Sequence, residues 1–315
     1  AGASERRAHE QSILAGYRAR FCEIRWHECE DAASLADVGP AAVHRWLAEP
    51  GLRIGVGSLE PHYFAGITGA HKTISVGAMS RAAIEENHAA AMKPEARPLV
   101  LAGNPVHEGI ARAVEAIERA GGRTLALNEV IVQGALVAAT AGRPLAAVEE
   151  GAPLVRRLFG YRLAAPVDLL VARVAPPLDR DFYQADKGIK NTEAAVRDGG
   201  VLLLEAECRS GVGIDHFLEL LAEARSYEQA LARVAERGYR LGDHKAVRLR
   251  HLTDRRRVHV GLVTRGIDPE LGHTLGICVF SDPEEAAAWA RELTGERPRA
   301  LMVEDAGNTV VEVAG

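Results

Sequence analysis

The chain has 315 residues, of which 47% are hydrophobic, 26% charged and 5% aromatic, and its formal net charge is −5. These values are typical of a folded globular protein and exclude a disordered or collagen-like chain. The negative charge argues against a global positive field that would attract nucleic acid or an anionic membrane surface.

Helices and strands alternate along the whole sequence. Apolar residues at three- and four-residue spacing predict helices at 5–17, 40–48, 79–92, 106–120, 143–158, 182–197, 214–223, 226–238, 243–254 and 283–294. Short apolar runs bounded by glycine, proline or aspartate predict buried strands at 20–25, 52–57, 98–102, 123–128, 167–173, 200–206, 257–264, 276–280 and 299–303. This alternation predicts an α/β fold with mostly parallel sheets.

A second series of strand and helix units begins near residues 158–166, after a helix that ends in a Phe-Gly pair. The chain length suits two domains of ordinary size. We therefore expect an N-terminal, cofactor-anchoring domain over 1–158, truncated at its start, and a C-terminal α/β domain over 159–300, with a cofactor cleft between them. A terminal segment follows at 301–315. This segment could return to pack against the first domain.

The number and spacing of the cysteines and the hydropathy of the sequence indicate where in the cell such a chain would be found. The four cysteines, Cys22, Cys29, Cys208 and Cys278, form no C-x-x-C pair and are too few for a secreted disulfide scaffold. A reducing cytoplasm is the simplest location for such a chain. No run of about 18 apolar residues occurs, so the sequence predicts no membrane-spanning helix.

The loop from Leu59 to Thr73 is the most unusual segment. It gathers His62, His71 and Lys72 in a glycine-rich stretch between a predicted strand and a predicted helix. Glycines let the backbone approach a ligand closely, and lysine near a helix start suits an anion. The spacing of a P-loop is absent. A surface loop with two hydrogen-bonded histidines is an equally good interpretation of the pattern.

Two predicted helices carry further candidate ligands. A neutral His88 could bind a metal, although an exposed helix histidine is the simpler alternative. Gln184 and Lys187 are three residues apart and share one helix face. An amide and an ammonium on one face can bind a small carboxylate, whereas an ordinary polar helix face is the alternative.

The run from Val201 to Asp215, predicted as a strand, a glycine turn and a helix start, resembles half of a dinucleotide-binding fingerprint at Gly211-Val212-Gly213. The third glycine of the fingerprint is missing. The pattern therefore favours close backbone packing over phosphate binding.

Taken together, these segments resemble one family, the nickel-pincer-nucleotide lactate racemases. The matching motifs span roughly residues 52–250 in the family's order. They are Glu60–Gly66 with Gly69 and Lys72, Asn87-His88, Asn104–Val106, Tyr183–Lys187, Gly199–Cys208 and Gly242–Ala246.

The resemblance implies a cofactor that the composition could not suggest. It is a pyridinium-3-thioamide-5-thiocarboxylate mononucleotide, the nickel-pincer nucleotide, whose two sulfur arms hold nickel. The resemblance implies a thioamide link from Lys72 to this cofactor, with Gly69 and His71 beside it, and places His88 as the protein ligand of nickel. Soft sulfur and carbon donors with an imidazole suit nickel in square-planar geometry. Proteins that synthesise and insert the cofactor are the implied partners.

The resemblance also implies an isomerase that racemises or epimerises a small 2-hydroxy acid. Hydride transfer to the pyridinium carbon avoids a carbanion and gives a planar 2-oxo acid. His62 is the implied acid and base for the hydroxyl proton, and Gln184 and Lys187 are the implied substrate ligands. A larger hydroxy acid such as a sugar acid, or a non-catalytic nucleotide- or anion-binding relative, stays open as an alternative.

Two departures from the family pattern stand out. Where the family has Gly-x-His-Arg, with a second catalytic histidine, this chain has Gly2-Ala3-Ser4-Glu5-Arg6. We expect either a fragment of a longer protein or a member that works with one acid/base histidine. The second departure is His71, which precedes Lys72 and could be a substitute acid/base, a phosphate contact or a structural residue.

Overall fold

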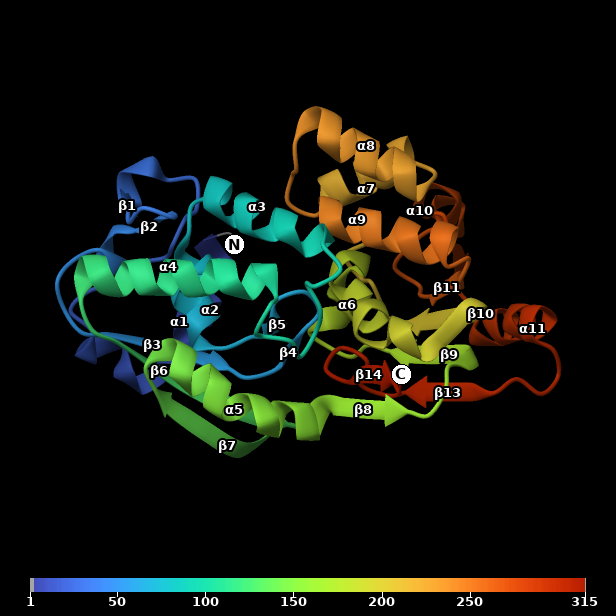
Figure 1. Ribbon diagram of the computed structural model, residues 1–315, viewed down its shortest axis with the longest axis horizontal. Coiled ribbons are helices and arrows are strands. Elements are labelled where there is room, and N and C mark those ends of the chain that lie inside the picture. Colours follow the sequence, from blue (N-terminus) through green and yellow to red (C-terminus); the bar gives the residue numbers. More distant parts are fainter. Residues whose placement is uncertain (1–2, 315) are drawn as a thin grey trace.

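The computed structural model describes residues 3–314, without the side chains at positions 3–5, 9 and 15. Two α/β domains lie side by side, the N-terminal one coloured blue to green and the C-terminal one yellow to red in Figure 1. Most of the strand pairs between the described residues are parallel. The predicted fold class is therefore confirmed.

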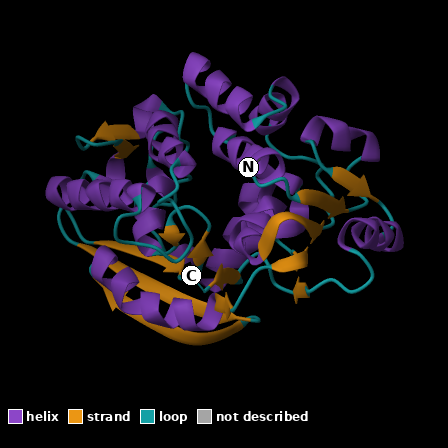
Figure 2. Cartoon of the chain, turned by 45° about the vertical axis from the view of Figure 1, so that its right-hand side comes forward, coloured by secondary structure: helices purple, strands orange, loops and turns teal. Residues whose placement is uncertain are grey.

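The body of the N-terminal domain consists of strands β3 (Arg53–Ser58), β6 (Thr124–Val132) and β7 (Ala135–Gly142) and helices α2 (Ala70–Ile74), α3 (Arg81–Ala89), α4 (Pro105–Gly121) and α5 (Pro144–Phe159). The strands form one sheet in the order β3-β6-β7, with β3 parallel to β6 and β7 antiparallel to β6. Helices α2 and α5 pack on one face of this sheet, and Figure 2 shows α5 lying along it.

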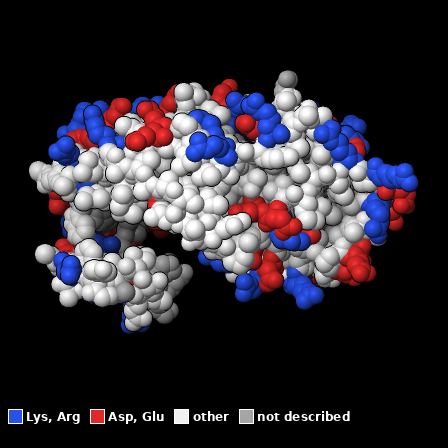
Figure 3. Space-filling model, turned by 90° about the horizontal axis from the view of Figure 1, so that it is seen from below, with Lys and Arg blue, Asp and Glu red and all other residues white. Residues whose placement is uncertain are grey.

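The opposite face of the same sheet is apolar and exposed. Ile54, Val56 and Leu127 leave 46–63% of their surface in solvent there. Figure 3, which views the molecule from below, shows a broad uncharged surface on this side. The helices therefore bury only one face of the sheet.

The segment before β3 contains α1 (Ala3–Leu14) and the short antiparallel pair β1 (Leu35–Asp37) and β2 (Ala42–His44). The predicted helix at 40–48 is wrong, because β2 and a single 3₁₀ turn occupy this range and only one of its apolar side chains, Val43, is completely buried. The predicted strand at 20–25 is also wrong. Phe21 is 49% exposed, so this apolar run has no sheet to join.

The C-terminal domain is built on strands β9 (Val167–Arg173), β10 (Val196–Glu205), β11 (His259–Val263), β12 (Cys278–Phe280) and β13 (Ala300–Val303). All are parallel, in the order β12-β11-β10-β9-β13. The central run Val201–Leu204 is buried on both faces, as expected for an inner strand of a parallel sheet.

The helices of this domain are α6 (Phe182–Thr192), α7 (Asp215–Glu223), α8 (Tyr227–Arg237), α9 (Asp243–Arg250), α10 (Gly272–Leu275) and α11 (Pro283–Thr294). Helix α11 packs against Val201 and Leu203, whereas Leu202 and Leu204 point into the core formed with α6, α7 and α9. Helix α6 is shorter than the predicted 182–197, because the chain turns after Thr192 and enters β10.

The two domains are joined by a parallel pair formed by β8 (Gly160–Leu163) and β14 (Val310–Val313). Val310 packs in the N-terminal core, whereas Val311 packs in the C-terminal core. The predicted strand at 98–102 is wrong: Leu99 has a φ of 62°, which interrupts an extended chain, and its N–H donates to Gly66. Within the described residues, no helix is long and apolar enough to cross a membrane.

Candidate active site

A buried amide holds the loop between β3 and α2 in place. This loop contains the short antiparallel pair β4 (Pro61–His62) and β5 (Gly66–Ile67). Asn104, which caps α4, donates from Nδ2 to the carbonyl oxygens of Phe64 at 2.9 Å and Val100 at 3.0 Å. A Cβ at Gly66, where φ is +82°, would lie 2.1 Å from the Val100 oxygen, so only glycine fits.

His62 lies on β4 with one ring nitrogen engaged. The Ala65 N–H donates to its Nδ1 at 3.2 Å, and Nε2 has no hydrogen-bond partner in the described part of the chain. Burial lowers the pKa of His62 well below its ordinary value, and the nearby positive charges of Lys72 and Lys187 lower it further. The ring is therefore neutral near pH 7.

Two lysines from different domains lie within electrostatic range of each other. Burial and the charge of Lys187 lower the pKa of Lys72 to about 8. Burial also lowers the pKa of Lys187. Neither ammonium has a hydrogen-bond or ion-pair partner among residues 3–314 with described side chains. Two unpaired, partly buried lysines next to a neutral histidine are chemically suited to an anion or an electrophile.

Helix α6 presents Gln184 and Lys187 on one partly buried face. Every other residue of this helix is buried, and Asp181 caps its start by accepting from the Gln184 N–H at 2.8 Å. The three-residue spacing therefore has the consequence predicted from the sequence, since both side chains leave the same face.

His88 lies near the end of α3 and is 8% exposed. Its ring meets Phe64 edge-on at 4.9 Å, and its Nδ1 is buried with no hydrogen-bond partner among the described residues. Burial, followed by the charge of Lys72, lowers its pKa to about 3. The imidazole is therefore neutral and has a free lone pair, as a metal ligand requires.

The described residues do not form a metal cage by themselves. Among them, no group of three or more histidine, cysteine, aspartate or glutamate side chains could hold an ion. An ion bound to His88 therefore needs most of its donors from a bound molecule. This donor set fits a metal that a cofactor brings with it.

Two further residues of the predicted cofactor loop are packed closely within the N-terminal domain. A Cβ at Gly69 would lie 2.8 Å from Leu59 and 3.0 Å from the Asn128 amide oxygen, so this glycine permits close protein packing. His71 is completely buried, and its ring contacts that of His107 at 5.5 Å. Burial and this histidine lower the pKa of His71 to about 3.

The site also contains residues that the sequence motifs did not single out. Tyr63 contacts His244 of α9, and Tyr239 contacts the same imidazole from its other side. Lys245 is almost fully buried and forms an ion pair with Asp186 of α6 at 3.5 Å. The motif Gly242–Ala246 contained the signal, but no local pattern could show that its imidazole faces Tyr63 in the other domain.

The turn Gly211-Val212-Gly213 packs against the start of α6. The N–H groups of Phe182 and Tyr183 donate to the carbonyl oxygens of Gly211 and Val212. A Cβ at Gly213 would lie 2.8 Å from the Tyr183 side chain. Close packing, which the sequence favoured over phosphate binding, accounts for Gly213, whereas Gly211 lies in open space and is favoured by its φ of +73°.

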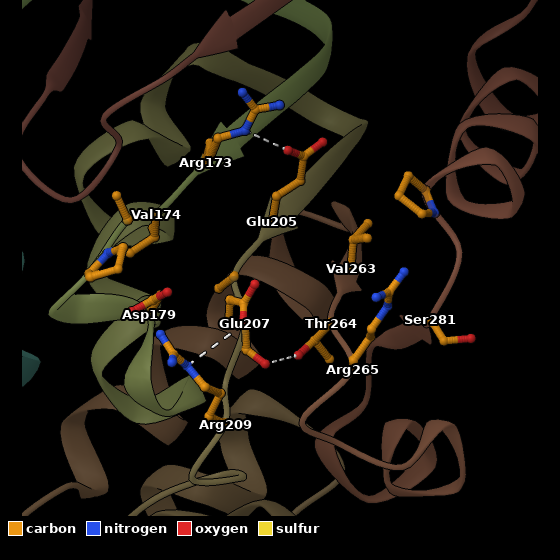
Figure 4. Close-up of a pocket in the computed structure, with 14 residues that line it drawn as sticks. Arg173, Val174, Asp179, Glu205, Glu207, Arg209, Val263, Thr264, Arg265 and Ser281 are labelled. Carbon is orange, nitrogen blue, oxygen red and sulfur yellow. Dashed lines mark hydrogen bonds and ion pairs between the residues drawn. The ribbon is translucent and has the colours of Figure 1, made fainter.

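A large cavity of about 910 Å³ lies at the carboxyl ends of β9 to β12 (Figure 4). Its charged side chains largely neutralise one another. Arg173 pairs with Glu205 at 2.8 Å, and Arg209 lies 3.6 Å from Glu207. None of the predicted site residues lines it. The groups without partners that define the candidate active site therefore lie elsewhere, between α6 and the loop that carries His62.

Two family domains match most of the chain. Residues 4–98 match the lactate racemase N-terminal domain, and residues 165–311 match the lactate racemase C-terminal domain. The chain belongs to the lactate racemase family. Its two halves therefore correspond to the two domains of that family, in the same order.

Individual relatives agree with this assignment. The chain is 32% identical to a lactate racemase of Thermoanaerobacterium thermosaccharolyticum over 65% of its own length and 48% of the relative's. It is 26% identical to a lactate racemase of Lactiplantibacillus plantarum over 92% of its own length and 70% of the relative's. It thus spans about half of the first relative and more of the second.

Two solved structures resemble the fold. The lactate racemase apoprotein from Thermoanaerobacterium thermosaccharolyticum superposes with a TM-score of 0.81 at 26% identity, covering 90% of this chain and 70% of that one. A protein from Thermotoga maritima superposes with a TM-score of 0.70 at 17% identity, covering 91% of this chain and 77% of that one. The second likeness supports the fold alone.

Proposed function

We propose that the chain is an isomerase that racemises or epimerises a 2-hydroxy acid with a nickel-pincer nucleotide linked through Lys72. The observation that carries the proposal is the meeting of four side chains from two domains, His62, Lys72, His88 and Lys187, each of which has a polar atom without a hydrogen-bond partner among the described residues. Their pKa values are all lowered, and the charges of Lys72 and Lys187 act on His62. Unpaired polar groups at one place are typical of a site that a ligand completes.

Two residues suit the cofactor. A pKa of about 8 leaves Lys72 with a useful fraction of free amine at neutral pH, which an acylation at its Nζ requires. The neutral His88 has a lone pair for nickel. When bound, the nickel-pincer nucleotide supplies an electrophilic pyridinium carbon that accepts and returns a hydride.

Helix α6 suits the substrate. The ammonium of Lys187 pairs with the carboxylate of a 2-hydroxy acid, and the amide of Gln184 hydrogen-bonds it and limits its rotation. Fixing the carboxylate at two points holds C2 in one place while its hydrogen leaves and returns.

His62 suits the hydroxyl proton. The Ala65 N–H donates to Nδ1, so the proton of the neutral ring lies on Nε2 in this arrangement. To accept the hydroxyl proton at Nε2, the ring would take the second tautomer, with its own proton on Nδ1, and give up the contact with Ala65. The imidazolium formed in this way would return the proton to the oxygen when the hydride comes back to the 2-oxo acid. The absence of charge on the ring favours the acceptance step at neutral pH.

The test loads the chain with cofactor by producing it together with the synthesis and insertion proteins of the family, which we expect as partners. Enantiomers of lactate, malate, 2-hydroxyglutarate, phenyllactate and sugar acids are then followed by chiral chromatography. We expect interconversion of a short acid. Activity on sugar acids alone would instead support the larger-substrate alternative.

Two variants separate the roles. His62→Ala should lower turnover by about 10²–10⁴-fold, the usual contribution of general acid and base catalysis. Lys187→Ala should raise the apparent KM by about 10- to 150-fold, because a charged hydrogen bond is lost. His259→Ala, an exposed histidine on β11, is the control and should change neither. A loaded chain that converts none of these acids contradicts the proposal and favours a non-catalytic anion-binding protein.

A further inference from the structure

Helix α9 of the C-terminal domain contacts both halves of the proposed active site. Toward the N-terminal domain, His244 Nε2 lies 2.9 Å from the Tyr63 hydroxyl, one residue from His62. Its Nδ1 lies 2.7 Å from the hydroxyl of Tyr239, in the loop before the helix. Both ring nitrogens of a completely buried imidazole are therefore satisfied, each by one tyrosine.

Tyr63 is held at its backbone as well as at its hydroxyl. Arg248, one turn after His244, donates to the Tyr63 carbonyl oxygen at 3.3 Å and also to that of Ala96. The Tyr63 ring stacks on His62 with 5.3 Å between centroids and 14° between planes. The position of the His62 ring is thus tied to a residue that α9 holds at two points.

The neighbouring residue of α9 holds the substrate helix. Lys245 donates to the Tyr183 carbonyl oxygen and pairs with Asp186, both on α6. Its ammonium lies 4.9 Å from the Tyr63 ring centre and 4.3 Å from that of Tyr183, so it contacts one tyrosine of each domain. Along α6, Tyr183 directly precedes Gln184, and Asp186 directly precedes Lys187.

We infer that α9 is a bracket, formed by His244, Lys245 and Arg248, that fixes the acid/base His62 relative to the substrate helix α6. The inference rests on the proposed function for the roles of His62 and α6. His244 is a positioning residue in this scheme, because it acts through Tyr63. A neutral imidazole donates from one nitrogen and accepts at the other, so it can bridge two hydroxyls, whereas an apolar side chain of similar size cannot.

The first test needs no cofactor. The Ala65 amide donates to His62, so its hydrogen exchange reports how firmly that ring is held. Tyr63→Phe and His244→Leu should each raise amide exchange in the segment 61–66 by about five- to tenfold, the effect of losing one buried hydrogen bond. Tyr161→Phe removes the hydroxyl of an exposed tyrosine and is the control. Exchange in 61–66 that stays at the control value would overturn the bracket.

The second test uses the loaded protein. Tyr239→Phe and Tyr63→Phe keep both rings and should retain nickel and the adduct at Lys72, while kcat falls about tenfold and KM changes little because Gln184 and Lys187 remain. If kcat falls only in proportion to the fraction of protein that is folded or loaded with cofactor, then His244 has a structural role alone and the inference is refuted.

The two tests separate this inference from the proposed function. If the loaded wild-type chain converts no hydroxy acid, the proposed function fails whatever the exchange data show, and the catalytic role of the bracket fails with it. If the wild-type chain is active and both tyrosine variants keep the wild-type kcat, only the bracket fails. His244→Asn keeps a donor and an acceptor and should restore part of the exchange protection that His244→Leu removes.

Discussion

The pKa of Lys72 makes the most direct prediction about this site. A pKa of about 8 instead of 10.5 leaves about 9% of the amine neutral at pH 7, compared with about 0.03% for an unshifted lysine, a gain of about 300-fold. Brief acetylation of the cofactor-free chain between pH 6 and 10, followed by peptide mass spectrometry, should show half-maximal labelling of Lys72 near pH 8. The exposed Lys93 is the reference in the same digest.

Removing the neighbouring charge tests the cause of the shift. Lys187→Met should move the Lys72 midpoint above 8 but keep it below 10.5, because burial is the larger cause and remains. Lys187→Arg keeps the charge and should leave the midpoint near 8. Labelling of Lys72 that rises in parallel with that of Lys93 over the whole range, or a midpoint that Lys187→Met does not change, would refute the electrostatic reasoning.

Three further predictions concern stability and the metal. Asn104→Ala should lower the free energy of unfolding in urea by about 2–4 kcal/mol, because a helix cap is lost and buried carbonyl groups lose their donor. A loss below about 1 kcal/mol would contradict the role of Asn104 in holding the loop between β3 and α2. His88→Ala should lower nickel affinity about 10- to 100-fold in the loaded protein while the adduct at Lys72 persists, and equal nickel content in variant and wild type would reduce His88 to a helix residue. The free energy of unfolding of the cofactor-free chain should rise between pH 8 and 10, since Lys72 and Lys245 lose their protons near pH 8 when folded but only near 10.5 when unfolded; Lys72→Met should flatten this slope.

The sequence predicts the C-terminal domain better than the N-terminal one, for a physical reason. Val201–Leu204 is a continuous apolar run that is buried on both faces, and α11 is capped by Asp282, starts at Pro283 and stops before Gly295. Such local signals suffice for inner strands and capped helices. The sequence analysis did not predict strands β8 and β14. They are short and pair across 150 residues of chain, so no local pattern indicates them.

In the candidate site too, local features could be predicted from the sequence, whereas contacts between distant segments could not. The shared face of Gln184 and Lys187 follows from helix geometry, and the structure bears it out. The contact of Tyr63 with His244 joins residues 181 positions apart and depends on how the two domains pack. The burial that turns His71 toward His107 also depends on packing, and the sequence offers no means to distinguish it from the burial of Lys72.

The arrangement of charges explains how one site can serve both the attachment of a cofactor and the binding of an acid. Burial and the charge of Lys187 lower the pKa of Lys72, and under the proposed function the linkage of Lys72 would remove its charge and leave Lys187 as the cation for the substrate carboxylate. Both lysine charges lower the pKa of His62, so the loss of the charge on Lys72 works to raise that pKa. A carboxylate paired with Lys187 offsets the second charge and works in the same direction. Linkage at Lys72 and substrate binding at Lys187 would therefore each remove a charge that weakens His62 as a base, which favours the proton transfer of the proposed reaction.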